Sequence, residues 1–216
     1  MFDKVGLFEG LGPEELSVLA ERSLTRSFPK HTVLISEGDQ SDSLYVIESG
    51  KVKVYVSDED GKEMILNILG PGEQFGEIAL MDDAPRSASV MTLEPSRVGI
   101  ISRADFQAAL REHPGMAFNL IRLLAGRVRT LTGSVKSLAL MDVYGRVART
   151  LLDLAQEEDA EGNRVINQRL THQEIANMVG ASREMVSRIF KDLTTGGYIT
   201  VGKASITINE RLPRRW

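Results

Sequence analysis

The hydrophobic pattern of this chain changes period once, near residue 102. From Phe28 to about Ile101 apolar residues recur at every second position, as in the run 52–56, where three valines alternate with Lys53 and Tyr55. A period of two is typical of strands with one buried face, which we expect to hold the valines. Turn signals at residues 37–39, 49–50, 60–61 and 70–72 separate this run from further strands predicted at 44–47, 64–69 and 98–101. Short strands at near-regular spacing predict a β-sandwich or barrel.

Beyond residue 103 the pattern becomes helical. From Pro114 onward six apolar residues recur at heptad spacing: Ile121, Leu124, Val128, Leu131, Val135 and Leu138. A narrow apolar face of this kind is typical of a coiled-coil seam, so we expect the helix to pair with its copy in a homodimer. A helix packed along its own barrel is the alternative, although such a helix usually shows a wider apolar face. Residues 130–134 are mostly weak helix formers and are predicted to be its least stable part.

One short region combines a glycine, a carboxylate and a guanidinium within a dozen residues. It comprises the segments FGEIAL, residues 75–80, and PRSA, residues 85–88. Gly76 lets the backbone approach a ligand closely, and the residues after it can begin a short helix whose free N–H groups favour an anion. Arg86 suits a phosphate, Ser87 adds a hydroxyl, and Glu77 can accept a hydrogen bond from a sugar. The region therefore predicts a site for a molecule with both a sugar and a phosphate.

These residues resemble the phosphate-binding cassette of cyclic-nucleotide-binding domains, in particular that of the bacterial cyclic AMP receptor protein and fumarate-nitrate regulator family. The resemblance implies that the Gly76–Ile78 backbone, Arg86 and Ser87 hold a cyclic phosphate, while Glu77 holds the ribose 2′-hydroxyl. It also implies four further ligand-binding positions: Leu66, Arg127, Leu131 and Thr132. A buried ion pair between Glu77 and Arg86 that merely closes a β-barrel is the alternative.

The resemblance implies cyclic AMP as the allosteric effector. At Leu131, however, the best-known member has a threonine that hydrogen-bonds the adenine, and leucine can neither donate nor accept. Thr130 and Thr132 are the nearest residues that could take its place. The base of the nucleotide therefore stays open, and cyclic GMP, cyclic di-GMP and the absence of any ligand are the alternatives.

A second motif lies near the C-terminus. Residues 171–174, Thr-His-Gln-Glu, form a capping box that opens one helix, and residues 180–181 turn the chain. Ser182 is then expected to cap a second helix over 183–193, followed by a small β-wing over 196–208. The second helix carries four apolar residues on one face: Val186, Ile189, Phe190 and Leu193. This arrangement predicts a winged helix-turn-helix whose second helix recognises DNA.

The polar face of the second helix has the chemistry for reading base edges. Arginine binds guanine through two hydrogen bonds, and glutamate accepts one from the amino group of cytosine. Resemblance to the same family implies that Arg183, Glu184 and Arg188 contact bases, and it implies that four residues lie near phosphates: Thr171, Gln173, Ser182 and Lys203. A helical hairpin with a solvated polar face is the alternative.

Charge is distributed unevenly, although the net charge of the chain is −4. Residues 164–216 hold 9 Lys and Arg against 4 Asp and Glu, a net of +5, whereas residues 1–163 hold 17 against 26, a net of −9. A basic C-terminal part favours a nucleic-acid partner. In relatives the loop that corresponds to the acidic residues 156–162 can touch RNA polymerase, whereas most charge runs of this kind are solvated surface.

Composition excludes several other kinds of site. The chain has no cysteine, which removes disulfides and cysteine-ligated iron–sulfur clusters, and its 3 histidines match no metal spacing, so neither metal nor haem is expected. An enzyme acting on cyclic nucleotides is a rival hypothesis, but hydrolysis of a phosphodiester usually needs metals or a positioned base, and the cassette offers one carboxylate. No apolar run is long enough to span a membrane and no signal peptide opens the chain, so we expect a cytoplasmic protein.

The sequence thus predicts an α+β chain in three parts. Residues 1–112 are expected to form a cyclic-nucleotide-binding β-roll of the jelly-roll type, residues 113–141 the dimerisation helix, and residues 142–216 the winged helix-turn-helix domain. A hinge is expected at 139–142, with Asp142 as the N-cap of a helix that runs to about Gln156. The function we expect is that of a ligand-gated regulator of transcription, a homodimer on a near-palindromic operator in double-stranded DNA.

Overall fold

The computed structural model describes residues 2, 5–40, 42–155, 157–158, 162–168, 170–202, 205–209 and 212. The chain divides into two compact units. The first comprises Met1–Asp58 with Ile65–Thr130, and the second comprises Glu59–Met64 with Leu131–Trp216. The predicted division at residues 112 and 141 stays a prediction. No helix among the described residues has the length and the apolar character needed to cross a bilayer.

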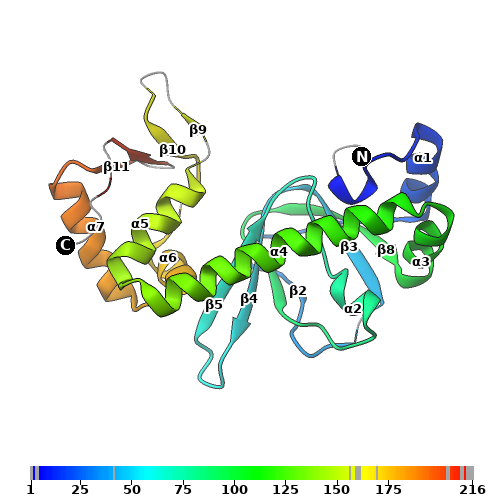
Figure 1. Ribbon diagram of the computed structural model, residues 1–216, viewed down its shortest axis with the longest axis horizontal. Coiled ribbons are helices and arrows are strands. Elements are labelled where there is room, and N and C mark those ends of the chain that lie inside the picture. Colours follow the sequence, from blue (N-terminus) through cyan, green and yellow to red (C-terminus); the bar gives the residue numbers. More distant parts are fainter. Residues whose placement is uncertain are drawn as a thin grey trace. The chain divides into compact units, whose positions relative to one another are not determined.

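Two four-stranded sheets form the body of the first unit (Figure 1). One has the order β1 (Leu24–Phe28), β8 (Ser96–Ser102), β3 (Ser43–Ser49) and β6 (Gln74–Phe75). The other has the order β2 (Val33–Ile35), β7 (Ser89–Thr92), β4 (Val52–Ser57) and β5 (Glu63–Leu69). The helices of this unit are η2 (Gly6–Phe8), α1 (Pro13–Arg22), α2 (Ile78–Met81), α3 (Arg103–Glu112) and the start of α4 (Gly115–Leu140).

Two apolar clusters hold these layers together. One lies between the two sheets and includes Ile47 and Phe75 of the first sheet and Val90 of the second. The other joins the first sheet to the helices, and its fully buried residues include Phe106 of α3 and Met116 of α4. Burial of large apolar side chains on both sides of the first sheet accounts for most of the favourable free energy of such a fold. It also fixes the short strand β6, where the predicted cassette begins.

The predicted strands are confirmed, but the expectation that β4 buries one face is wrong. Val52 is buried as predicted, yet Lys53 and Tyr55 on the opposite face are buried as well. The ammonium group of Lys53 lies 4.3 Å from the centre of the Tyr55 ring. A lysine can be buried in this way because its aliphatic stem packs against apolar surface while its charge interacts with an aromatic ring. Alternation alone therefore did not reveal that this strand is covered on both sides.

Helix α4 continues without a break to Leu140, through the weak helix formers at 130–134. Of the predicted hinge at 139–142, only Met141 and Asp142 lie outside a helix. The heptad positions are largely exposed in the single chain; Val135, for example, is 65% exposed. Met116 and Leu120, on another face of the same helix, are buried in the first unit. The helix therefore packs on its own barrel through one face, to which the heptad residue Leu124 also contributes, and leaves the other five heptad residues exposed.

The second unit is a helical bundle backed by a small antiparallel sheet (Figure 1). It contains α5 (Val143–Leu154), α6 (His172–Val179) and α7 (Arg183–Thr195), and its sheet has the order β11 (Ile199–Val201), β12 (Ile206–Ile208), β10 (Arg164–Ile166) and β9 (Glu157–Glu158). The predicted N-caps are confirmed, since the side chains of Asp142, Thr171 and Ser182 each accept a backbone N–H of the first turn. Gly180 ends α6 with a φ of 61°, in the left-handed region that glycine tolerates.

Candidate functional site

The turn from β6 into α2 can be made only by a glycine. Gly76 has a φ of +85°, and a Cβ added to it would lie 2.4 Å from Nη1 of Arg86 and 3.2 Å from the carbonyl oxygen of Ser43. The residues that follow form the short helix α2, as predicted. Phe75, just before the glycine, stacks on Tyr45 of β3 with ring centroids 5.0 Å apart, and the two residues face each other in the sheet register. The turn is therefore held rigidly at the edge of the first sheet.

Arg86 is buried, and its guanidinium binds backbone carbonyls. Nη1 donates to the carbonyl of Gly76 at 2.7 Å and Nη2 to that of Ser43 at 2.8 Å. Burial lowers the pKa of Arg86, an effect opposed by Tyr45, Asp42 and Glu77, yet an arginine keeps its charge at neutral pH. The alternative of a barrel-closing ion pair between Glu77 and Arg86 is wrong, because the carboxylate of Glu77 pairs with another residue.

That residue is Arg127 of α4. Its Nη1 forms an ion pair with Oε1 of Glu77, and its Nη2 donates to the carbonyl of Gln74 at 2.8 Å. Glu77 is 0% exposed, and its other oxygen, Oε2, has no hydrogen-bond partner. Burial raises the pKa of Glu77, although Arg127 and, less strongly, Arg86 act in the opposite direction. The guanidinium of Arg127 thus stabilises the negative charge of a carboxylate that is buried among apolar groups.

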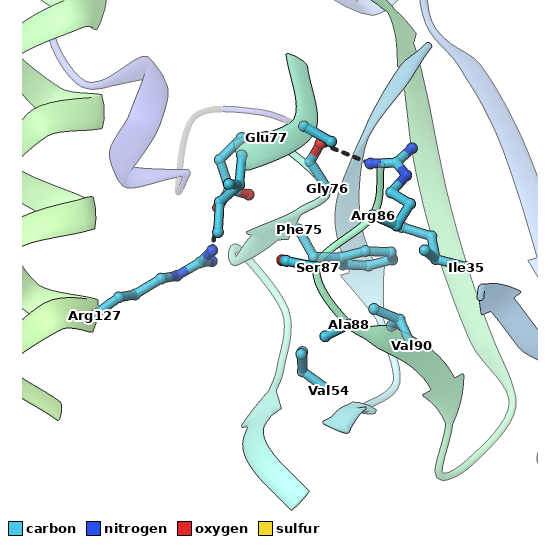
Figure 2. Close-up of a pocket in the computed structure, with 12 residues that line it drawn as sticks. Ile35, Val54, Phe75, Gly76, Glu77, Arg86, Ser87, Ala88, Val90 and Arg127 are labelled. Atoms are coloured by element: carbon cyan, nitrogen blue, oxygen red, sulfur yellow. Dashed lines mark hydrogen bonds and ion pairs between the residues drawn. The ribbon is translucent and has the colours of Figure 1, made fainter. Parts of the chain in front are cut away.

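These groups surround a cavity of about 60 Å³ within the first unit. Figure 2 shows Glu77 turned toward Arg127 on one side of the cavity and Arg86 reaching the carbonyl of Gly76 on the other. The remaining wall is mostly apolar and is lined by Ile35, Val54, Phe75, Ile78, Ala79, Ala88 and Val90, with Ser87 beside Arg86. An apolar wall with a few convergent polar groups is typical of small-molecule sites, although such pockets usually exceed about 300 Å³. The space that these side chains enclose is thus smaller than that of a usual small-molecule pocket.

Sequence reasoning found the polar residues of this cavity and Ile78, and missed the part of its apolar wall that comes from the second sheet. Gly76, Glu77, Ile78, Arg86, Ser87 and Arg127 line the cavity as a group. Leu66 lies on β5 and does not line it, while Leu131 and Thr132 follow on α4 and belong to the second unit, so their role stays a prediction. The missed residues Ile35, Val54 and Val90 come from three strands of the second sheet. Only the alternation around Val54 gave a signal for any of them.

The second candidate site is the exposed side of α7. Val186, Ile189, Phe190 and Leu193 are buried in the core of the second unit, as predicted. Arg183, Glu184 and Arg188 are exposed, and so are Thr171, Gln173 and Ser182 at the starts of α6 and α7. Lys203, the predicted phosphate contact of the wing, lies outside the described residues. The described part of the chain has no group of three or more His, Asp or Glu side chains placed to hold a metal ion.

Comparison with known families identifies the class of both sites. The family model described as "Cyclic nucleotide-binding domain" matches residues 25–113, and that described as "Crp-like helix-turn-helix domain" matches residues 145–212. The chain belongs to the CRP/FNR family of transcription regulators. It is thus a DNA-binding regulator with a cyclic-nucleotide-binding domain, and not an enzyme.

Individual relatives cover nearly the whole chain. The "CRP-like cAMP-activated global transcriptional regulator" of Mycobacterium tuberculosis is 36% identical, over 98% of this chain and 96% of that protein. The "cAMP-activated global transcriptional regulator Vfr" of Pseudomonas aeruginosa is 37% identical, over 86% and 90%. Among solved structures, the c-di-GMP responsive global regulator CLP of Xanthomonas campestris matches with a TM-score of 0.80 at 26% identity, over 93% of this chain and 100% of that one.

Proposed function

We propose that this chain is a homodimeric regulator whose binding to operator DNA is controlled by cyclic AMP. The observation that carries the proposal is Oε2 of Glu77, a fully buried carboxylate oxygen without a hydrogen-bond donor. Leaving such an atom unsatisfied costs free energy, of the order of 1–3 kcal/mol or more for a charged group. The 2′-hydroxyl of a ribose donates one hydrogen bond and removes this cost, while Oε1 keeps its pair with Arg127.

The cyclic phosphate would lie on the other side of the cavity. Two of the five N–H groups of Arg86 donate to the carbonyls of Gly76 and Ser43, so three donors remain for an anion. Ser87, beside it, is exposed and adds a hydroxyl. Because Gly76 has no side chain, the backbone after it can approach the phosphate closely. A molecule with a sugar on one side and a phosphate on the other therefore suits the two polar sides of this cavity.

Similarity to the named relatives supports cyclic AMP as the effector, since two of them are described as cAMP-activated. Cyclic di-GMP is the second candidate, for two reasons. The structural relative CLP is described as c-di-GMP responsive. In addition, Leu131 offers no polar group to the base at the position where the family's best-known member has a threonine.

The uncovered heptad face of α4 is the surface that we assign to the dimer. Ile121, Val128 and Val135 are each more than 60% exposed in the single chain. Exposed apolar residues that repeat every seven positions along three or more turns match a coiled-coil partner of the same sequence. A two-fold dimer presents two copies of α7 to DNA, so the operator is expected to be near-palindromic, with half-sites one helical turn apart. Because the named relatives are bacterial regulators, whose DNA lies in the cytoplasm, we assign the protein to that compartment.

Contact with RNA polymerase is a further part of this proposal, through the acidic loop at 156–162. Only Glu157, Glu158 and Gly162 of that loop are among the described residues.

Titration calorimetry with cyclic AMP, cyclic GMP and cyclic di-GMP tests the effector, and DNA binding with and without each nucleotide tests its control. We expect cyclic AMP to bind at one site per chain and to raise affinity for the selected operator. Binding of none of the three, together with unchanged DNA affinity, would overturn the proposal. Light scattering of the free protein tests the dimer independently.

A further inference from the structure

One arginine outside the cavity holds the segment that carries the candidate phosphate-binding groups. Arg103 is the first residue of α3, and its Nη1 forms an ion pair with Oδ1 of Asp83, in the loop that follows α2. Its Nη2 donates to the carbonyl of Ala79, within α2, at 3.2 Å. A helix as short as α2 leaves carbonyls without partners of its own, and Arg103 supplies a donor for one of them. One guanidinium therefore binds both α2 and the loop after it.

The backbone at Asp83 gives this loop a reason to need support. Asp83 has a φ of 55°, in the left-handed region that residues with a side chain occupy at a cost in free energy. Its side chain is 83% exposed, and the ion pair with Arg103 connects it to the body of the first unit. The carboxylate of Asp82 accepts the backbone N–H of Ala84 at 3.1 Å, a contact that stays within the loop. The ion pair of Asp83 thus ties this turn to the rest of the unit.

Arg103 is itself firmly anchored. Phe106 of the same helix is buried in the core of the first unit, and the backbone N–H of Arg103 donates to the carbonyl of Asp42 at 2.6 Å. The next carbonyl along the chain, that of Ser43, accepts Nη2 of Arg86. Arg103 and Arg86 are therefore both fixed to consecutive carbonyls at the start of β3.

Arg103 can affect a bound ligand only indirectly. Glu77, Ile78, Ala79 and Arg86 line the cavity, and Arg103 is not among the described residues that do so. Its positive charge nevertheless reaches the phosphate side of the cavity: burial lowers the pKa of Arg86 most, and Arg103 lowers it further as a second cation. An effect of Arg103 on binding must therefore come through the residues that it holds or through its charge.

We propose that Arg103 is a positioning residue for the nucleotide phosphate. By holding α2 and Asp83, it keeps the backbone N–H groups at the start of α2 and the guanidinium of Arg86 directed into one cavity. Without it, α2 and the loop adopt several arrangements, and the apparent affinity falls in proportion to the fraction that fits the phosphate. No local pattern connects residues 83 and 103, so sequence analysis assigned Arg103 no role. This inference rests on the proposed binding of a cyclic nucleotide.

Two substitutions separate positioning from long-range attraction of the phosphate. Arg103→Gln and Asp83→Ala both break the ion pair, but they change the net charge of the chain in opposite directions. Positioning predicts that both weaken cyclic AMP binding in calorimetry, by about three- to tenfold if the fitting fraction falls to about 10–30%. Attraction alone predicts that Asp83→Ala strengthens binding. Asp83→Asn should lose less than Asp83→Ala, because asparagine tolerates the left-handed conformation and still offers Arg103 an oxygen.

The rates of binding distinguish positioning from a direct contact. A smaller fitting fraction slows association, whereas loss of a ligand contact mainly speeds dissociation. Stopped-flow measurements with a fluorescent cyclic AMP analogue should show slower association in Arg103→Gln and Asp83→Ala, with dissociation close to that of the wild type. Hydrogen exchange over residues 78–85 of the ligand-free protein should be faster in both. Arg97→Gln breaks a pair with Glu48 at the other end of β8; as the control, it should match the wild type in all of these measurements.

Thermal unfolding verifies that each variant is folded, and Asp83→Ala, which changes an exposed loop residue, carries the test if Arg103→Gln is not. Wild-type affinity in both variants, tighter binding by Asp83→Ala, or an effect confined to dissociation overturns the inference alone. If the wild type binds cyclic GMP or cyclic di-GMP in place of cyclic AMP, the same comparison is made with that nucleotide. If it binds none of the three, the proposed nucleotide site falls, and this inference falls with it.

Discussion

Glu77 illustrates how a residue that suits a ligand can act against the stability of the protein. Its carboxylate is fully buried with one oxygen unsatisfied, and burial raises its pKa. A carboxyl whose pKa is higher in the folded than in the unfolded state contributes stability below the ordinary value of about 4.3, and this contribution is lost as the pH rises through the folded-state pKa. At neutral pH the ionised Glu77 is therefore a cost to folding.

Glu77→Gln should consequently raise the melting temperature of the ligand-free protein at pH 7 and leave it nearly unchanged at pH 4. The glutamine keeps the shape of the side chain but carries no charge into the apolar site, and Arg127, whose side chain is 27% exposed, can turn to water. Thermal unfolding between pH 4 and pH 8 measures both effects. Equal destabilisation at the two ends of that range would contradict this account of Glu77. The same variant should bind cyclic AMP more weakly.

Arg86 is predicted to bind the phosphate, and its substitution should affect both binding and folding. Arg86→Ala removes the charged donors, so nucleotide affinity should fall about tenfold or more, as expected for hydrogen bonds of a charged group worth about 1.5–3 kcal/mol. It also leaves the carbonyls of Gly76 and Ser43 without their donor, so the melting temperature should fall as well. Calorimetry below the melting temperature separates the two effects. Ser87→Ala is the matched control and should lose only a few-fold in affinity; normal binding by Arg86→Ala would refute the predicted phosphate site.

Glu184 is exposed on the first turn of α7. A carboxylate near DNA is repelled by phosphates, so its presence there is favourable only if it recognises a base. Glu184→Ala should relax the preference at one base pair of the half-site by about 1–3 kcal/mol and barely change affinity for non-specific DNA. Selection of binding sites by the variant measures this. Should the preferred base stay the same at every position, the assigned contact of Glu184 would be withdrawn. Lys191→Ala, an exposed cation on the same helix, is the comparison expected to weaken all sequences alike.

At the scale of elements, α4 has two apolar faces with different partners. Met116 and Leu120 are buried in the first unit and Leu124 is partly buried against the same core, whereas the other five heptad residues are exposed. Val135→Glu places a charge on the exposed heptad face, and in a dimer each chain then loses the burial of one valine, worth about 1.5–3 kcal/mol. The dimer dissociation constant should rise about hundredfold or more. Sedimentation at several concentrations measures it, with Lys136→Glu as the control one residue off the seam; equal effects of both changes would argue against this face.

Most elements could be predicted from the sequence because their signals are local. The N-caps at Asp142, Thr171 and Ser182 each depend on a side chain and the backbone within three residues, and all three are confirmed. Contacts between distant segments left no such trace. Arg86 binds Ser43 across 43 residues, and His172 binds Ser187 across 15. The resemblance to a family predicted that Arg127 is a ligand-binding position. Its ion pair with Glu77 could not be predicted, because it joins α4 to the start of α2.

At the scale of the whole molecule, the candidate nucleotide site lies in residues 1–163, which carry a net charge of −9, and the candidate DNA-binding helix lies in residues 164–216, which carry a net charge of +5. Helix α4 contributes residues to both compact units. If cyclic AMP raises operator affinity by some factor, thermodynamic linkage requires the operator to raise cyclic AMP affinity by the same factor. Couplings of this kind are typically about 5- to 150-fold. Calorimetric titration of cyclic AMP into the free protein and into the operator complex measures one factor, and DNA titrations give the other. Two factors that disagree beyond error would mean that the proteins compared differ in more than bound nucleotide, for example in oligomeric state.

The two carbonyl bonds of Arg86 also bear on how such proteins change over generations. This arginine joins β3 to the turn before α2, so a descendant that stopped responding to nucleotides would still lose stability by replacing it. Selection for folding alone can therefore preserve the residue after selection for signalling has ended. Ser87 is exposed and has no comparable structural role, so it can be replaced without loss of stability. In comparing descendants of this protein, a retained serine next to the arginine is the better sign that the nucleotide is still recognised.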